Sequence, residues 1–175
     1  MSRTVLLAAV LAALSLPAPL PAQTTLTDAQ IVAIFDQANT ADIETGQLAA
    51  SRAHAKEVRE LGQQFADAHR AVRAQGRELA KKLGVTPALP PGNRGAAEHR
   101  EVMGRLRERS GTAFDRAFLD HEIAFHQAVI DAVTRTLLPA IQNPELKAFV
   151  EKVAPAFQGH LQMAQELRQK LSASR

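Results

Sequence analysis

Apolar residues recur at intervals of three and four positions along most of this chain, and that spacing constrains the fold more than any other feature. Four long segments carry such a stripe, at residues 27–53, 58–83, 112–138 and 144–171. This is the period of one face of an α-helix, and we find no segment that alternates apolar and polar residues as a half-buried strand does. The pattern predicts an all-α fold, a four-helix bundle in which each helix buries its stripe.

The first two segments have clear helix ends. Thr27 is followed three residues later by Gln30, which is the capping-box pattern that starts a helix. Gly84 follows the last apolar residue of the second segment, and glycine commonly ends a helix because it adopts positive φ without strain. Both helices are therefore expected to be about 25 residues long, or about 38 Å at 1.5 Å per residue.

The third and fourth segments are delimited in the same way. Thr112 is expected to cap the third helix, with Asp115 in its first turn, where the positive end of the helix dipole stabilises a carboxylate. Pro139 is expected to end that helix. Asn143 is expected to cap the fourth helix, with Pro144 at its first position.

The connection between the second and third long helices decides the topology. Residues 84–96 contain three prolines and three glycines, so they form a loop, and a short polar helix is predicted at 97–109. A connection of this length can run back along the bundle. We therefore predict ferritin-like connectivity, in which a long crossover carries a short extra helix between helices two and three. A connection that folds back on one end would give a simple up-down-up-down bundle instead.

The N-terminus has the pattern of a secretory signal peptide. Arg3 precedes an apolar run over residues 5–16, and small residues and prolines follow up to Ala22. The run is about 12 residues long, whereas a membrane-spanning helix needs ~20. We predict a signal peptide at 1–22, a single four-helix-bundle domain at 23–175, no membrane span after cleavage, and a periplasmic or outer-membrane-associated location. The chain has no cysteine, which excludes a lipoprotein anchor and disulfides.

The charges give no sign of a nucleic-acid partner. The formal net charge is +3, and basic and acidic residues are interspersed along the helices. The chain has neither Trp nor Tyr to stack on bases. A homo-oligomer or a protein partner in the cell envelope stays open, and a second apolar stripe on the third long helix is the candidate contact surface. Its residues are Leu119, Ile123, Ile130 and Leu137.

Short segments along the chain resemble a bacterial family, the domain of unknown function 4142. The resemblance extends from about Asp28 to Leu171, and it depends on the order and spacing of its segments more than on any one of them. The segments are Asp42–Ala49, Phe65–His69, Phe114–Phe118, His126–Gln127, Leu146–Phe149 and His160–Leu161. Asp42 stands where the family is expected to have Glu. The resemblance implies a ferritin-like fold and export, often under the label outer membrane protein, and it implies no activity.

Six polar residues interrupt the apolar faces of the helices or border them. The three histidines in this set each have apolar residues three or four positions away on both sides, so the 100° step per residue directs them inward. Counted at 1.5 Å per residue, Asp42 and these histidines all fall near the middle of the bundle. The candidate metal-ligating residues are Asp42, Glu44, His69, Glu122, His126 and His160.

This arrangement admits two interpretations. Imidazole and carboxylate groups can together hold a Zn, Fe, Mn or Cu ion without a thiolate, and the three histidines would then converge on one centre. The histidines can instead be core residues that hydrogen-bond to carbonyls or carboxylates and fix the pairing of the helices. A ferroxidase-type di-iron site is disfavoured, since Ala66 and Phe157 stand where two Glu-x-x-His motifs would need their glutamates.

The sequence leaves two main classes of function, and an enzyme that acts on a small molecule in the bundle core comes last. It lacks a Ser/His/Asp order, a phosphate-binding loop and a His-Glu-x-x-His motif, so we assign no catalytic residue and lean against an enzyme. The first hypothesis is an exported structural or interaction module of the cell envelope, related to stress. The alternative is a histidine-rich metal-binding or redox-protective protein with a site between the helices.

Overall fold

The computed structural model describes residues 26–173, and the regular structure within that range is entirely helical, as the apolar spacing predicts. The predicted signal peptide lies outside the described residues. The helical elements are α1 (Asp28–Arg52), α2 (Lys56–Lys82), α3 (Gly95–Arg107), α4 (Gly111–Ala132), the π-helical turn η1 (Val133–Leu137), α5 (Leu138–Ala140) and α6 (Pro144–Ala173).

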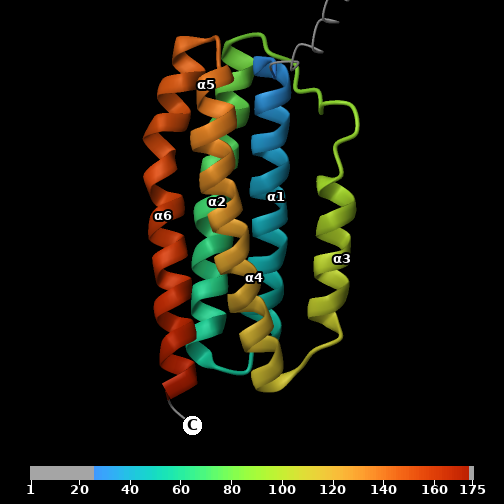
Figure 1. Cartoon of the computed structure of the whole chain (residues 1–175), viewed down its shortest axis with the longest axis vertical. Coiled ribbons are helices and arrows are strands. Elements are labelled where there is room, and N and C mark those ends of the chain that lie inside the picture. Colours follow the sequence, from blue (N-terminus) through green and yellow to red (C-terminus); the bar gives the residue numbers. More distant parts are fainter. Residues whose placement is uncertain (1–25, 174–175) are drawn as a thin grey trace, which may run out of the picture.

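The four long helices form a bundle with a crossover. α1 packs mainly on α2 and α4 packs mainly on α6, while α2 also contacts α6 and α1 also contacts α4. In Figure 1 the chain descends through α1, returns through α2, and descends again through the connection that carries α3 along the outside of α1. α4 therefore runs parallel to α2. The predicted crossover with its short extra helix is confirmed, and α3 begins and ends two residues earlier than expected.

Three of the predicted helix ends are confirmed by their hydrogen bonds or dihedral angles. The Thr27 hydroxyl and the Gln30 side chain form a reciprocal capping box at the start of α1. Gly84 adopts a φ of 66° directly after α2, which a residue with a side chain rarely does. The Asn143 side-chain oxygen accepts the backbone N–H groups of Glu145 and Leu146 at 2.9 and 3.2 Å, and so caps α6.

The predicted boundaries of the third long helix are wrong. α4 begins at Gly111 after Ser110, so Thr112 lies inside the helix and does not cap it. Asp115 does not serve its own helix, because its carboxylate accepts the backbone N–H groups of His54 and Ala55 at 2.7 and 2.9 Å. It caps the start of α2 from across the bundle. Pro139 does not end the helix either, since η1 and α5 continue helical backbone to Ala140.

A contact between two glycines brings α1 and α2 unusually close together. A Cβ built on Gly46 would lie 2.6 Å from the carbonyl oxygen of Gly62, and one built on Gly62 would lie 2.7 Å from the carbonyl oxygen of Gly46. Only glycine fits on either side. Asn39 and His69 each lie seven residues, or about two turns, from the glycine of their own helix. The contact therefore also places these two side chains at the same height.

The core consists of two apolar clusters separated by a polar layer. One cluster surrounds Phe35 and Phe157, and the other surrounds Phe65 and Phe118. The buried polar residues that lie between them along the helices are Asn39, Asp42, Thr45, His69, Glu122, His126 and His160. Most of the second stripe of the third long helix, proposed as a contact surface, is buried within these clusters: Leu119, Ile130 and Leu137 are buried and Ile123 is half-buried.

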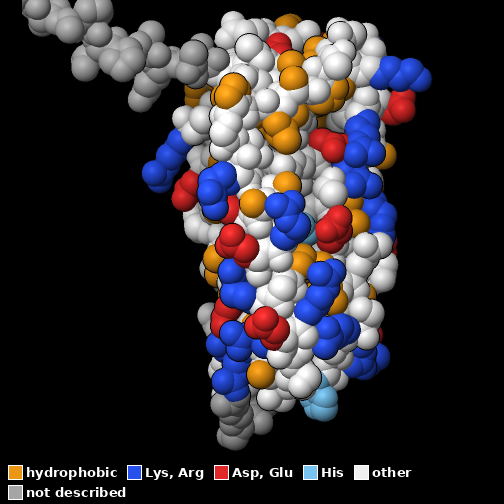
Figure 2. Space-filling view, turned by 90° about the vertical axis from the view of Figure 1, so that its right-hand side faces the viewer, with side chains coloured by type: hydrophobic (Ala, Val, Ile, Leu, Met, Phe, Trp, Pro, Cys, Tyr) orange, Lys and Arg blue, Asp and Glu red, His pale blue; other side chains and the backbone are white. Residues whose placement is uncertain are grey.

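The surface is charged along most of its length. On the face shown in Figure 2, acidic and basic side chains are mixed over most of the molecule, and hydrophobic side chains gather toward the end where α1 begins. Leu89 is the only large hydrophobic residue in the described part of the chain that is exposed, at 47%. Among residues 26–173, none of the helices combines the length and apolar character needed to cross a membrane.

A candidate metal centre between the helices

Asp42, His69, His126 and His160 come from four different helices and meet in the middle of the bundle. All four are buried. His69 Nε2 lies 2.9 Å from Oδ2 of Asp42 and 3.1 Å from Nδ1 of His160. His126 Nε2 lies 3.3 Å from each of the same two atoms. One carboxylate oxygen and three ring nitrogens therefore face a common point.

These distances fit the edges of a coordination tetrahedron. Bonds of about 2.0–2.1 Å place any two ligand atoms of a tetrahedral ion about 3.3 Å apart. Four of the six edges of this set measure 2.9 to 3.3 Å. The ligating nitrogens of the three histidines all lie within 4.8 Å of one another. These four separations are thus in the range that bonds to one ion require.

The ring of His69 is oriented by a chain of two hydrogen bonds. The Asn39 amide nitrogen donates to the carbonyl oxygen of Phe35 at 2.8 Å, which turns the Asn39 side-chain oxygen toward the histidine. That oxygen lies 2.8 Å from His69 Nδ1 and can only accept, so Nδ1 carries the proton. Nε2 of the neutral ring consequently presents a lone pair to the centre, which is how proteins usually orient a metal-binding histidine.

His126 is oriented in the same way by its own helix. Its Nδ1 lies 2.9 Å from the backbone carbonyl oxygen of Glu122, one turn earlier in α4. A carbonyl can only accept, so Nδ1 donates and Nε2 presents a lone pair. The remaining ring, His160, can bring at most one proton to the centre through Nδ1. The four central atoms therefore share at most one hydrogen when the imidazoles are neutral.

The carboxylate of Asp42 is charged and lacks hydrogen-bond donors. Burial by itself would raise its pKa, but the close contact with His69 and the charges of the three histidines outweigh burial and hold the pKa below its usual value. With neutral histidines, neither of its oxygens accepts a hydrogen bond from the described residues, and only a proton on His69 Nε2 would supply one, across the 2.9 Å contact. A buried ion without donors is costly unless a cation neutralises it.

Glu122 lies beside this centre. It is fully buried, and neither of its carboxyl oxygens has a hydrogen-bond partner among the described residues. One oxygen lies 3.5 Å from His126 Nδ1. Burial, followed by the nearby charge of Asp42, raises the pKa of Glu122 well above its usual value. Together with Asp42 and His126 it forms a second group whose ligand atoms lie within 4.8 Å of one another.

Burial also shifts two residues of the centre, His126 and His160, toward their neutral forms. It lowers the pKa of His126, against the opposing charge of Asp42. It lowers the pKa of His160 to about 4, with further lowering by the charges of His69 and His126. A neutral imidazole is the form that binds a metal ion.

The structure brings together five of the six predicted residues and leaves Glu44 outside. Glu44 is exposed on α1, and its carboxylate lies 2.7 Å from Nε2 of His99 on α3. The expectation that it borders the inner face is wrong, because two steps of about 100° from Asp42 place Glu44 on the opposite side of α1, which faces α3. Sequence reasoning also missed Asn39. Its place four residues after Phe35 and three before Asp42 puts it on the same inner face, and this spacing could have identified it.

A small apolar cavity adjoins the centre. The cavity holds about 50 Å³ and is lined by His69, His126, Asn39 and the apolar residues around them. Val133 and Leu137 of the π-helical turn η1 form part of its wall. Such turns interrupt the regular hydrogen bonding of a helix and occur frequently at functional sites.

Comparisons with known proteins give a family and a shared fold. The sequence model described as the domain of unknown function 4142 matches residues 13–167. None of the curated proteins compared with the chain matches it. Among solved structures, the chain is similar to "CopM in the Cu(II)-bound form", with a TM-score of 0.64 and 14% identity over 83% of this chain and 98% of that one. At this identity the similarity establishes the fold alone.

Proposed function

The chain belongs to the family of the domain of unknown function 4142, and we propose that it binds one divalent transition-metal ion between its helices. The ligands are Asp42, His69, His126 and His160. Residues 1–22 are proposed to export the protein to the cell envelope, where it would hold or buffer the metal.

One observation carries this proposal: four buried ring and carboxylate atoms from four helices converge, with at most one hydrogen among them when the imidazoles are neutral. In a satisfied polar core, each acceptor faces a donor. Here Asp42 Oδ2 and the Nε2 atoms of His69 and His126 face one another at 2.9 and 3.3 Å, although all three carry lone pairs. A bound cation turns that mutual repulsion into coordination. With neutral imidazoles, the interpretation as a purely hydrogen-bonded core leaves these atoms unpaired; that interpretation needs an imidazolium at His69 that donates through Nε2 to Asp42.

The ligand set indicates the class of metal and the kind of role. Three imidazoles and one carboxylate suit Zn²⁺, and imidazole also suits Cu²⁺. The structural neighbour described as Cu(II)-bound makes Cu²⁺ the second ion to test. All four coordination positions are filled by the protein, which is typical of sites that store or structure an ion rather than sites that activate water. We therefore propose holding of the metal, without a catalytic step.

The interaction-module hypothesis, which the sequence placed first, lacks the surface that it required. Three of the four residues of its contact stripe are buried in the core and the fourth is half-buried. The exposed large hydrophobic residues of the described chain are limited to Leu89. That hypothesis would therefore depend on a charged surface or on partners that bind elsewhere.

Calorimetric titration of the mature, untagged and chelator-treated protein tests the proposal. We expect one Zn²⁺ or Cu²⁺ per chain, and substitution with Co²⁺ should give the intense visible absorption of a tetrahedral ion. His69→Ala and His160→Ala should each abolish this binding. His54→Ala is the matched control, because His54 is exposed at the turn before α2 and should leave the binding unchanged. Metal-free protein whose melting temperature does not respond to either ion would refute the proposal.

A further inference from the structure

A second cavity lies near the end of the bundle where α1 begins, away from the histidines. It holds about 500 Å³, a size typical of small-molecule sites, and is lined by α1, α2, α6 and the crossover loop. Gly76 on its wall lies seven residues along α2 from His69, or about 10 Å at 1.5 Å per residue. We refer to it as the crossover pocket. The metal ligands do not line it.

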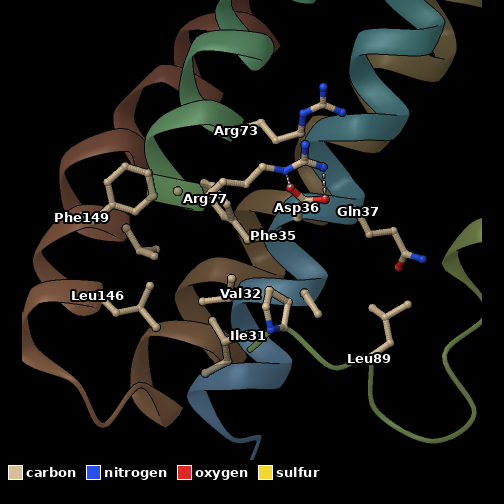
Figure 3. A pocket seen from close by; sticks show the side chains of 14 residues that line it. Ile31, Val32, Phe35, Asp36, Gln37, Arg73, Arg77, Leu89, Leu146 and Phe149 are labelled. Carbon is tan, nitrogen blue, oxygen red and sulfur yellow. Dashed lines mark hydrogen bonds and ion pairs between the residues drawn. The ribbon is translucent and has the colours of Figure 1, made fainter. Parts of the chain in front are cut away.

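Most of the crossover pocket is apolar. Figure 3 shows Ile31 and Val32 of α1 and Leu146 and Phe149 of α6 lining one side, with Leu89 of the crossover loop opposite them. The loop is tied to the bundle at this point, since the Ala88 N–H donates to the carbonyl oxygen of Ala29 at 3.2 Å. Leu89 lines the pocket, and yet 47% of its surface is exposed. An apolar ligand in the pocket would cover this side chain.

The polar rim of the pocket carries one positive charge that no carboxylate neutralises. Arg77 forms two hydrogen bonds with Asp36, at 2.5 and 2.9 Å, so these two charges cancel (Figure 3). Arg73, one turn earlier on α2, donates to the hydroxyl of Thr40 at 3.0 Å, and no ion pair with it occurs among residues 26–173. A half-buried guanidinium beside an apolar cavity can pair in a fork with a carboxylate, phosphate or sulfonate group.

Gly76 leaves space on the floor of the pocket. A Cβ built there would lie 3.5 Å from ring atoms of Phe35 and Phe149, which is ordinary contact. Gly76 is helical and has no positive φ, so no backbone constraint demands glycine at this position. Its lack of a side chain instead keeps the floor between the two phenylalanine rings open.

We propose that the crossover pocket binds a small anionic amphiphile, namely a long-chain carboxylate. Its tail lies between Leu89 and the apolar residues of α1 and α6, and its carboxylate pairs with the guanidinium of Arg73. The pocket does not use the metal ligands, so this binding is independent of the proposed metal site.

Titration of the full mature chain with dodecanoate, below the concentration at which it forms micelles, tests the proposal. We expect saturable binding of one molecule per chain. Arg73→Gln should weaken it about tenfold to a hundredfold, as loss of a charge-assisted hydrogen bond does. Gly76→Leu should weaken it at least tenfold by filling the floor. Dodecyltrimethylammonium, which has the same tail and a positive head, should bind at least tenfold more weakly than dodecanoate.

Two controls separate this site from general effects on charge and from the metal centre. Arg70→Gln removes an arginine of the same helix that pairs with Asp67 outside the pocket, and it should leave dodecanoate binding unchanged. Asp42→Asn should also leave it unchanged. Unaltered melting temperatures would show that the variants are folded. Equal binding of the two amphiphiles, or dodecanoate binding that Arg73→Gln and Gly76→Leu both leave intact, would overturn the proposal.

Discussion

Asp42 and Asp115 are both buried carboxylates, and they differ in the hydrogen bonds that reach them. Asp115, near the start of α4, accepts two backbone N–H groups at the start of α2. Asp42, in the polar layer at mid-bundle, accepts none and faces the lone pairs of two histidines. The two residues are similarly inaccessible, with 1% of the surface of Asp42 and 2% of that of Asp115 exposed.

This contrast separates a structural carboxylate from a proposed metal ligand. Asp115 has the donors that a buried ion requires, so it stabilises the fold without any other partner. Asp42 lacks them, so the fold tolerates it only at a cost that a cation removes. Burial alone does not distinguish the two roles, whereas the number of donors does. Four measurements can break or sharpen the distinction.

The largest expected effect is on Asp115. Asp115→Ala removes two charge-assisted hydrogen bonds, each contributing about 1.5–3 kcal/mol, and should lower the free energy of unfolding by about 3–5 kcal/mol, with or without metal. Urea denaturation measures this. Asp120→Ala is the control on the same helix, because Asp120 forms only an exposed ion pair with Arg168 and its loss should change the free energy by less than about 1 kcal/mol. A similar effect of both variants would contradict the capping role.

Acid should destabilise the metal-free protein because the buried His160 of the polar layer resists protonation. The pKa of His160 is lowered to about 4 in the fold, against about 6.5 when unfolded, so the unfolded chain takes up the proton first. Stability that is present above pH 6.5 is therefore lost as the pH falls toward 4, by up to about 3 kcal/mol for this residue. Urea midpoints at pH 7, 5.5 and 4 should fall less steeply in His160→Gln.

Glu122 should change the free energy of unfolding in the opposite direction as the pH falls. Its raised pKa means that the folded protein binds the proton first, so acid stabilises the fold through this residue and offsets part of the histidine effect. Glu122→Gln should make the loss of stability toward pH 4 steeper than in the unsubstituted protein. Identical pH dependence in the unsubstituted protein, His160→Gln and Glu122→Gln would show that the layer is not buried in solution.

Asp42→Asn should affect the metal-bound protein far more than the metal-free one. Zn²⁺ at a hundred times its Kd should add about 2.7 kcal/mol to the stability of the unsubstituted protein, and the variant should lose this gain. Without metal, its free energy of unfolding should fall by less than about 1 kcal/mol or should rise, because an unpaired buried charge is removed. A loss of 3 kcal/mol in the absence of metal would make Asp42 a structural carboxylate like Asp115.

The smallest effect is expected at Glu44. Glu44→Gln removes an exposed contact with His99 and should change the free energy of unfolding by less than about 0.5 kcal/mol. The affinity for Zn²⁺ should stay the same, as measured by the same calorimetric titration. A clear loss of affinity would return Glu44 to the ligand set in which the sequence placed it.

Local patterns predicted the helices and most of their ends. The capping box at Thr27, the positive φ of Gly84 and the cap at Asn143 involve groups within a few residues of one another, so the sequence carries them directly. The role of Asp115 was missed because it depends on N–H groups about 60 residues earlier in the chain. The inward direction of the histidines also follows from periodicity. The outward position of Glu44 follows from it as well, since two steps of about 100° place Glu44 opposite Asp42, and only its contact with His99 depends on the packing of α3.

The sequence by itself determined that four amphipathic helices carry polar residues at mid-height, since periodicity and rise per residue are properties of a single helix. Only the tertiary structure decided which polar atoms meet and which of them have no hydrogen-bond donor. Coordination and hydrogen bonding depend on separations of about 3 Å and on the direction of each lone pair. The separations depend on the close approach of α1 and α2 at Gly46 and Gly62. The direction of the His69 lone pair depends on the orientation of the Asn39 amide. No pattern within one helix contains them.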